Sequence, residues 1–160
     1  MNNLPKISII TPTFNSEKFI LNNLTSVNNQ TLTNYEQIII DNSSSDNTIN
    51  IIKNFKSEKI KLISETDNGI YEAINKGIKL ARGDIISILH SDDQFYDQNV
   101  LDLIIESFEK YNTEIVYGNL VYISKNDPKK VVRVWLSNHY IANSFHKGWS
   151  PPHPSFFVKK

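Results

Sequence analysis

The apolar positions of the first 111 residues follow two alternating patterns. Short apolar runs without polar alternation, typical of strands buried on both faces, occur at residues 6–10, 35–40, 61–64 and 85–89. Between these runs, apolar residues recur every three or four positions, which predicts amphipathic helices. The four helical stripes are Ile20, Leu24 and Val27; Ile49, Ile52 and Phe55; Ile70, Ile74, Ile78 and Ala81; and Val100, Ile104, Ile105 and Phe108. This order predicts an α/β fold, with right-handed crossovers and helices on both faces of a mostly parallel sheet.

Polar residues and a glycine beside these stripes predict where the helices begin and end. Ser16 and Ser45 are each expected to cap the N-terminus of the helix that follows. Asp97 is expected to open the fourth helix. Gly83, directly after the third stripe, is expected to end that helix in the left-handed conformation.

The pattern changes after residue 114. Residues 115–123 and 131–135 are rich in β-branched and aromatic side chains and flank a turn at 125–128, which predicts an antiparallel hairpin added to the parallel half. The tail from Leu136 onward is rich in His, Ser, Trp and Pro and is expected to be irregular. Because no repeat or linker interrupts the chain, residues 1–160 are expected to form a single domain.

Composition limits the classes of function. The 17 basic and 17 acidic residues cancel, so net charge predicts no attraction to nucleic acid or to an anionic membrane. The lack of cysteine excludes disulfides and thiolate zinc sites. The sequence shows neither a secretory leader nor an apolar stretch of the roughly 20 residues that would cross a bilayer. These features favour a soluble, intracellular protein.

The strand at 85–89 is followed by two adjacent acids, Asp92 and Asp93. Ligands of open α/β sheets bind where parallel strands end at their carboxyl side. Two neighbouring carboxylates repel each other unless a cation or hydrogen-bond donors compensate them, and carboxylate oxygens suit Mg²⁺ or Mn²⁺. The alternative is a solvated turn or helix cap, in which Asp is also common.

Two further polar clusters follow predicted strands, at residues 11–15 and 41–43. Because the carboxyl ends of parallel strands meet along one edge of a sheet, the three clusters are expected to share a pocket. The chain contains neither G-x-G-x-x-G nor G-x-x-x-x-G-K-[ST], so a bound diphosphate would depend on a metal at Asp93. Asp41 would accept a hydrogen bond from a base, with Thr11 beside it; an Asx-turn onto Ser43 is the alternative for Asp41.

Five motifs in order resemble the signatures of family 2 glycosyltransferases. They are S-I-I-T-P-T-F-N at 8–15, I-I-I-D-N-S-S-S-D at 38–46, D-N-G-I-Y-E-A-I-N-K-G at 67–77, A-R-G-D at 81–84 and S-D-D at 91–93. H-P-S-F-F at 153–157 is similar more loosely. The resemblance implies the A-type glycosyltransferase fold and an inverting, metal-dependent transfer from a nucleoside diphosphate sugar, with UDP-sugars favoured.

The resemblance also implies roles for particular residues. Asp92 and Asp93 correspond to the metal and diphosphate site, with Asp93 the stronger metal candidate and Mn²⁺ or Mg²⁺ the ion. His153 corresponds to the acceptor side, and a loop histidine without a ligand is the alternative. The positions implied in nucleotide-sugar binding are Thr11, Pro12, Phe14, Asn15, Asp41, Asp67, Asn68 and Asp92.

Residues 1–93 then form the nucleotide-sugar-binding half, and residues 94–160 the start of an acceptor-side half. The acceptor would be a saccharide or lipid-linked molecule in polysaccharide or glycoconjugate synthesis, which places the protein in the cytoplasm or at the inner face of the membrane. Two departures stand out: His90 replaces an acid that many relatives have, and no acid matches the general base, which an inverting transfer needs. A non-catalytic nucleotide-sugar-binding module is therefore the alternative function.

Three aromatic residues of the tail region, Trp135, Tyr140 and Trp149, have two interpretations. They would stack on a sugar ring, or they would be buried in the core, which is commoner for aromatic side chains.

Overall fold

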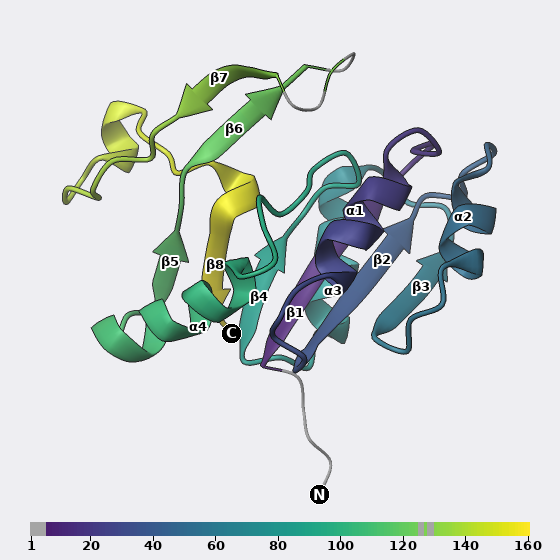
Figure 1. The fold of residues 1–160 in the computed structure, drawn as a ribbon, viewed down its shortest axis with the longest axis horizontal. Helices are drawn as coiled ribbons and strands as arrows, with labels where there is room; N and C mark the ends of the chain where they lie inside the picture. Colours follow the sequence, from purple (N-terminus) through teal and green to yellow (C-terminus); the bar gives the residue numbers. More distant parts are fainter. Residues whose placement is uncertain (1–5, 125–126, 128–129) are drawn as a thin grey trace, which may run out of the picture.

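The computed structural model describes residues 6–124, 127 and 130–160. Its centre is a six-stranded sheet with the order β3-β2-β1-β4-β8-β5 (Figure 1). The first four of these strands are parallel, and β8 lies antiparallel between β4 and β5. The bounds are β1 Ile7–Thr13, β2 Tyr35–Asp41, β3 Ile60–Ser64, β4 Ile85–Ile88, β5 Ile115–Tyr117 and β8 Phe156–Lys159.

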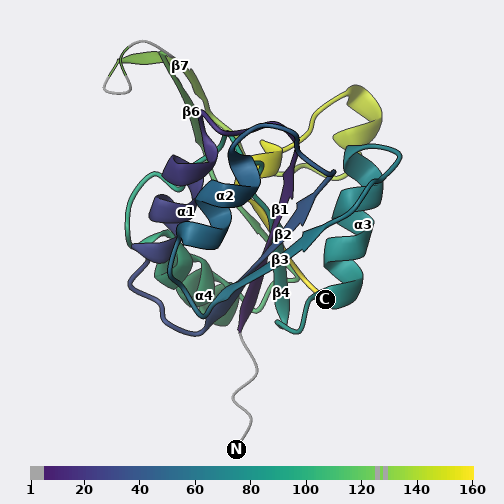
Figure 2. The same cartoon turned by 90° about the vertical axis from the view of Figure 1, so that its right-hand side faces the viewer.

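Helices cover both faces of the sheet, as the alternating pattern predicts. Figure 2 shows α1, α2 and α4 on one side and α3 on the other. The bounds are α1 Ile20–Asn28, α2 Thr48–Asn54, α3 Ile70–Leu80 and α4 Val100–Tyr111. Adjacent residues of β1 serve the two layers: Ile9 packs in the cluster that contains Leu101 of α4, and Ile10 packs in the cluster that contains Ala73 of α3. This explains why the parallel strands are apolar without alternation.

The predicted helix ends differ from the observed ones. α1 begins at Ile20 and α2 at Thr48, and neither N-cap residue, Phe19 or Asn47, makes a side-chain cap. The Asp46 carboxylate, rather than Ser45, accepts from the Thr48 amide (3.0 Å), so the capping roles predicted for Ser16 and Ser45 are wrong. The backbone carbonyl of Ser16 instead accepts hydrogen bonds from the amides of Phe19 and Ile20. The helix expected to open at Asp97 begins at Val100, although the Asp97 carboxylate accepts a hydrogen bond from the Asn99 amide just before it.

Gly83 is required for close packing rather than for a left-handed turn. Its φ is not positive, so the left-handed conformation predicted for it is wrong. α3 instead ends at Leu80, with Ala81 extended. A Cβ on Gly83 would lie 2.7 Å from the backbone nitrogen of Ser8, which only glycine avoids.

The predicted strand at 115–123 is two strands that belong to different sheets. β5 joins the main sheet, whereas β6 Leu120–Ile123 pairs antiparallel with β7 Val131–Trp135 in a separate two-stranded sheet. The predicted hairpin is confirmed in β6 and β7; of the turn predicted between them, residues 125, 126 and 128 lie outside the described residues. The break comes at Gly118, whose amide bonds to the Ser155 carbonyl.

The tail is not irregular throughout, because it ends in β8. Short 3₁₀ turns, η1 Phe145–Lys147 and η2 His153–Ser155, precede that strand. β8 fills the space between β4 and β5, and its Phe157 is fully buried against Phe95. A four-residue strand inserted antiparallel has no local periodicity that would distinguish it from a loop. Among the described residues, no helix has the length and apolarity to cross a membrane.

Candidate functional site

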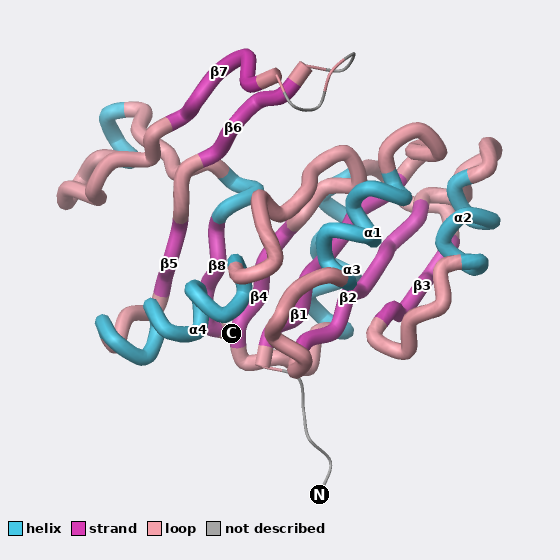
Figure 3. Tube along the Cα trace, in the orientation of Figure 1, coloured by secondary structure: helices cyan, strands magenta, loops and turns pink. Residues whose placement is uncertain are grey.

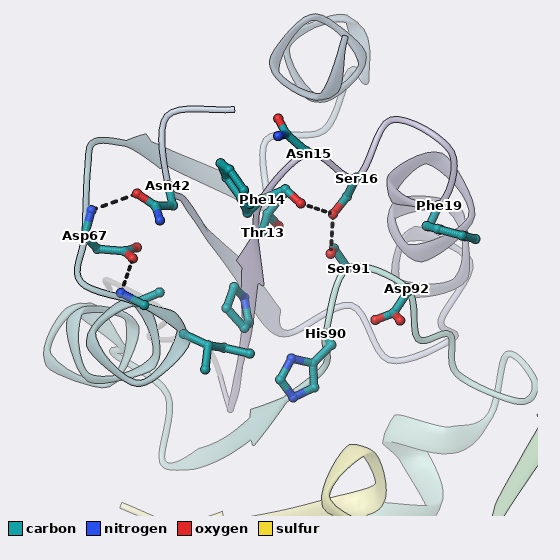
Figure 4. Close-up of a pocket in the computed structure, with 14 residues that line it drawn as sticks. Thr13, Phe14, Asn15, Ser16, Phe19, Asn42, Asp67, His90, Ser91 and Asp92 are labelled. Carbon is teal, nitrogen blue, oxygen red and sulfur yellow. Dashed lines mark hydrogen bonds between the residues drawn. The ribbon is translucent and has the colours of Figure 1, made fainter. Parts of the chain in front are cut away.

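The loops that follow β1, β2 and β4, drawn in pink in Figure 3, gather at the edge toward which the arrows of these strands point in Figure 1. A pocket of about 490 Å³ opens there. Figure 4 shows the pocket, in which the loop after β1 lies between the loop after β2 and the loop after β4. Its lining residues are Pro12, Thr13, Phe14, Asn15, Ser16, Phe19, Asn42, Asp67, Gly69, Ile70, Ala73, His90, Ser91 and Asp92. The expectation that the three polar clusters meet at one edge is therefore met by side chains from each of them.

Asp67 provides a buried acceptor in this pocket. Its amide donates to the side-chain oxygen of Asn42 (2.8 Å), and its Oδ1 accepts from the amide of Gly69 (2.8 Å). Its Oδ2 is buried and has no hydrogen-bond partner among the described residues. A buried carboxylate oxygen without a donor is costly, so this atom is ready to accept an N–H or O–H from a ligand.

Gly69 allows that arrangement. Its φ of 121° lies in a region that L side chains rarely adopt, and it immediately precedes α3. The turn from Asp67 into α3 therefore depends on a glycine, and the same turn places Ile70 in the pocket wall.

Asp41, the last residue of β2, bonds to residues around the loop that follows β2 and does not line the pocket. Its side chain is fully buried and accepts hydrogen bonds from the Ser44 amide (2.9 Å), the Ser44 hydroxyl and the Ser64 hydroxyl (2.8 Å). The alternative of a local turn is thus realised, with Ser44 rather than Ser43 as the donor. The pocket receives the next residue, Asn42, because successive side chains of a strand point to opposite faces.

Thr11 belongs to a buried polar network that holds the acidic turn. The side-chain Nε2 of Gln37 donates to the Thr11 hydroxyl (3.0 Å) and to the Asn23 side-chain oxygen (2.8 Å). Asn23, on α1, then donates to the backbone carbonyls of His90 (2.9 Å) and Asp93 (3.0 Å). Because all three polar side chains are buried, this network fixes the turn that carries the two acids.

Direct hydrogen bonds also join the loop after β1 to the loops after β2 and β4. The hydroxyls of Ser16 and Ser91 lie 2.7 Å apart (Figure 4). The Asn15 amide donates to the Ser44 hydroxyl (2.8 Å), and the Asn15 side-chain oxygen accepts from the Ser45 amide (2.9 Å). The pocket therefore has a preorganised polar wall.

The two acids differ in environment. Asp92 is exposed at the edge of the pocket, whereas Asp93 is partly buried beside it. Burial, followed by the negative charge of Asp92, raises the pKa of the Asp93 carboxyl to about 6. Among the described residues, no group of three acidic, histidine or cysteine side chains is arranged to hold a metal. The pair still suits Mg²⁺ or Mn²⁺, which is commonly bound by one or two carboxylates together with substrate phosphates and water.

His90 and His153 bring the tail close to the pocket. Their rings contact edge to face, with centroids 5.0 Å apart. His90 lines the pocket, and burial, together with the nearby His153, lowers the pKa of His90 against the opposing effect of Asp92. A neutral imidazole is therefore favoured at position 90.

The predicted binding residues fall into two groups. Pro12, Phe14, Asn15, Asp67 and Asp92 line the pocket. Outside its lining are Thr11, Asp41, Asn68, Asp93 and His153. The roles of both groups stay predictions. Asn42, Ser91 and Phe19 were not selected from the sequence, and His90 was treated there as a departure from the family pattern. Asn42, His90 and Ser91 closely follow predicted strands, and Phe19 directly precedes α1, so their positions could have indicated the pocket.

The tail aromatics form a cluster of their own. Trp149 contacts Tyr117, Tyr140 and Phe145, with ring centroids 5.4 to 5.7 Å apart. Tyr140 is exposed, and Trp135 and Trp149 are only partly buried, so none of the three belongs to the buried core. None of them lines the pocket.

Residues 8–158 match the family model described as "Glycosyl transferase family 2". The chain belongs to this family. Among curated relatives, it is 37% identical over 121 residues to the Escherichia coli UDP-Glc:alpha-D-GlcNAc-diphosphoundecaprenol beta-1,3-glucosyltransferase WfgD, covering 75% of this chain and 47% of WfgD. It is 31% identical over 126 residues to the PGL/p-HBAD biosynthesis glycosyltransferase of Mycobacterium tuberculosis (strain ATCC 25177 / H37Ra), covering 76% of this chain and 49% of that protein. The family 2 chain thus spans about half the length of these relatives.

Solved structures share the fold of this family 2 chain. S. aureus TarS 1-349 in complex with UDP-GlcNAc superposes with a TM-score of 0.69 at 24% identity, covering 76% of this chain and 36% of TarS 1-349. The mannosyltransferase PcManGT from Pyrobaculum calidifontis, in complex with GDP-Man and Mn²⁺, gives a TM-score of 0.65 at 20% identity, covering 79% and 38%. The predicted A-type glycosyltransferase fold, with an antiparallel hairpin near the C-terminus, is confirmed.

Proposed function

We propose that this chain binds a nucleoside diphosphate sugar, with UDP-sugars favoured, and contributes to its inverting, metal-dependent transfer to an acceptor hydroxyl. The observation that carries the proposal is the pocket at the carboxyl ends of β1, β2 and β4, with the unpartnered Asp67 Oδ2 on one side and Asp92 on the other. The names of two comparison proteins support the choice of donor: one is a UDP-Glc-dependent glucosyltransferase and the other was solved with UDP-GlcNAc.

In this proposal the two sides of the pocket hold different parts of the donor. Asp67 Oδ2 accepts a hydrogen bond from the base or ribose, and the exposed ring of Phe14 stacks on the base. Asp92 and Asp93 would hold Mg²⁺ or Mn²⁺, and the ion would supply positive charge that offsets the charge of the leaving group. Residues 1–93 thus supply the donor side, and residues 94–160 begin the acceptor side, which includes His153.

Positioning residues keep this arrangement rigid. Thr11 acts through Gln37 and Asn23 on the backbone of the acidic turn, and Asp41 holds the loop that presents Asn42. This assigns both residues an indirect contribution to donor binding. An Asp41→Ala variant is therefore expected to lose stability together with donor affinity.

The acceptor in this proposal is a saccharide or lipid-linked molecule of polysaccharide or glycoconjugate synthesis. The name of WfgD, whose substrate is a diphosphoundecaprenol-linked sugar, supports that class. The attacking hydroxyl would form the new bond to the anomeric carbon as the bond to the diphosphate breaks and the nucleoside diphosphate leaves. A base takes the hydroxyl proton.

Calorimetry with UDP, UDP-sugars and GDP-sugars, each with and without Mn²⁺, tests the donor site. A UDP-sugar is expected to bind, and to bind more tightly with Mn²⁺. Asp93→Ala should remove the gain from Mn²⁺, and Asp67→Asn should weaken binding about tenfold with or without the ion. Asp84→Ala is the matched control, since Asp84 is an exposed acid that lines a separate pocket. Lack of binding to every donor would disprove the proposal.

A donor-binding module without transfer activity is the second candidate. The observation that favours it is that Asp67 and Asp92, the two carboxylates among the described pocket-lining residues, both have donor-side roles here. Release of UDP from a bound UDP-sugar, with or without acceptor glycans, separates the two candidates. Measurable turnover that Asp93→Ala abolishes would exclude the non-catalytic module.

A further inference from the structure

The formal charge is divided unequally along a chain whose total is zero. Residues 115–160 contain seven Lys or Arg and a single acid, which gives +6, while residues 1–114 contain ten Lys or Arg and sixteen acids, which gives −6. The total of zero predicted no attraction to anionic surfaces. The division changes that expectation for one part of the molecule, the basic lobe, which comprises β6, Lys130, β7 and residues 136–149. Three of the seven cations, Lys130, Arg133 and Lys147, belong to this lobe, and it contains no acid.

The strands of this basic lobe expose apolar side chains. Val132 and Val134 on β7 are 65% and 53% exposed, and Val134 pairs with Val121 across the hairpin. Figure 1 shows the hairpin standing apart from the main sheet. A two-stranded hairpin is marginally stable in water by itself, and a contiguous exposed apolar patch marks an interaction surface.

The loop segment of the basic lobe adds aromatic and aliphatic groups. Ile141 and Phe145 are 70% and 56% exposed. Phe145 and Tyr140 pack on Trp149, whose ring nitrogen donates to the Ser137 carbonyl (3.1 Å), so the cluster holds its shape while its outer surface stays exposed. Aromatic rings held in this way are enriched where apolar and aqueous phases meet.

Cations accompany these apolar groups. Lys130, Arg133 and Lys147 are exposed, and none of them forms an ion pair with another described residue. The Arg133 guanidinium lies 5.5 Å from the centroid of the Tyr122 ring. Cations next to exposed aromatic and aliphatic side chains are the combination that binds the interface of an anionic bilayer.

Other partners fit this surface less well. A second copy of the chain would bring like charges together, which opposes self-association through this lobe. Nucleic acid would use the cations and rings, but it would give the exposed valines and Ile141 no apolar environment. An anionic lipid surface accommodates the charges, the rings and the aliphatic side chains together.

We propose that the basic lobe is a docking surface for an anionic lipid bilayer. Figures 1 and 2 both show the hairpin and the loop segment at the end of the molecule toward which β1 and β2 point. That end also carries the pocket. Docking would therefore bring the pocket close to the lipid surface, but the proposal rests on the lobe alone and does not require the donor site to be correct.

Co-sedimentation of the 160-residue chain with vesicles tests this proposal. Binding is expected with phosphatidylcholine vesicles that contain about 30% phosphatidylglycerol, is expected to be much weaker with phosphatidylcholine alone, and should fall as salt is raised. Each cation removed in Arg133→Gln and Lys147→Gln should lower the partition coefficient about fivefold. Val132→Ser combined with Val134→Ser should lower it at least tenfold, by about the burial of two side chains.

The matched control is Leu103→Ser combined with Lys110→Gln on α4. Leu103 is 55% exposed, and Lys110 lies 5.3 Å from the Tyr111 ring, so the control removes the same kinds of group from another surface. Circular dichroism melts show which variants fold. If the double valine variant does not fold, the vesicle binding of the Arg133→Gln and Lys147→Gln variants tests the proposal. UDP-sugar affinity, measured in parallel, is expected to stay unchanged, which separates failure of this proposal from failure of the donor site.

Several results would overturn the proposal. They are the absence of vesicle binding, equal binding to neutral and anionic vesicles, and an equal loss of binding in the α4 control. A concentration-dependent dimer that the valine variant abolishes would assign the surface to self-association instead. Oligonucleotide binding as strong as vesicle binding would assign it to nucleic acid.

Discussion

At the scale of single residues, sequence reasoning located the polar clusters but not which side chain of each reaches the pocket. Asp41 and Asn42 are adjacent, and the motif resemblance selected the acid. The structure buries Asp41 among three donors and places Asn42 in the pocket wall. Strand alternation requires one of two neighbours to face inward, but it does not say which one where the strand ends. Asp67 was selected for nucleotide-sugar binding, which stays a prediction; it lines the pocket, and its unpartnered oxygen could be found only from coordinates.

Glu36 illustrates a buried acid whose role is structural. Its carboxylate accepts from the Ser8 hydroxyl (2.7 Å), the Arg82 amide (2.8 Å) and the Arg82 guanidinium (2.9 and 3.1 Å). Burial acts to raise the pKa of Glu36, but the hydrogen bonds from Arg82 and Ser8 outweigh it and hold that pKa below its ordinary value.

Glu36→Gln is expected to lower the free energy of unfolding by about 2 kcal/mol at pH 7. Because the folded-state pKa is depressed, the stabilisation by the carboxylate is fully present above the unfolded pKa and is lost as pH falls through the folded one. The difference between wild type and variant should therefore narrow below about pH 4 in urea titrations. Glu109→Gln is the control, since its ion pair with Lys6 is exposed and should contribute less than about 0.5 kcal/mol. A pH-independent difference for Glu36→Gln would contradict the assignment.

At the scale of elements, the sequence predicted the strands and helices well wherever periodicity extended over enough residues. The four parallel strands and the four helices were all expected, because apolar runs and stripes report burial directly. The starts of α1, α2 and α4 were misplaced because several candidate polar residues precede each one, whereas α3 begins at Ile70, the first residue of its predicted stripe. β8 was missed because its position depends on β4 and β5, which lie far away in sequence.

Asn23 links an element to the site, since it carries the contact between α1 and the acidic turn. Asn23→Ala would leave the carbonyls of His90 and Asp93 without their side-chain donor. The variant is expected to lose about 2 kcal/mol of stability and most of the gain in donor affinity from Mn²⁺. Asn22→Ala, on the exposed side of the same helix, should change stability by less than about 0.5 kcal/mol. Thermal melts and calorimetry on the two variants provide the comparison, and equal effects would rule out a positioning role for Asn23.

At the scale of the whole molecule, stability is expected to be unevenly distributed. Residues of β1 and β2 are fully or almost fully buried between two helical layers, and each strand has a neighbour on both sides. Within the described part of the chain, β6 and β7 pair only with each other, and β7 is mostly exposed. The sequence predicted both pairs of segments as strands but not their relative stability, because that stability depends on burial by elements that are distant in the sequence.

Hydrogen exchange measures this difference directly. Amides of β6 and β7 that donate across the hairpin should exchange at least about a hundredfold faster than those of β1, because local opening of the hairpin exposes little buried surface whereas β1 opens only with the whole sheet. Anionic vesicles should slow exchange in β6 and β7 and leave β1 unchanged, if the basic lobe docks as proposed. If the amides of the hairpin were as protected as those of β1 in the absence of lipid, another part of the molecule would already stabilise the hairpin. The inference that the hairpin is stabilised by binding to a bilayer would then fail.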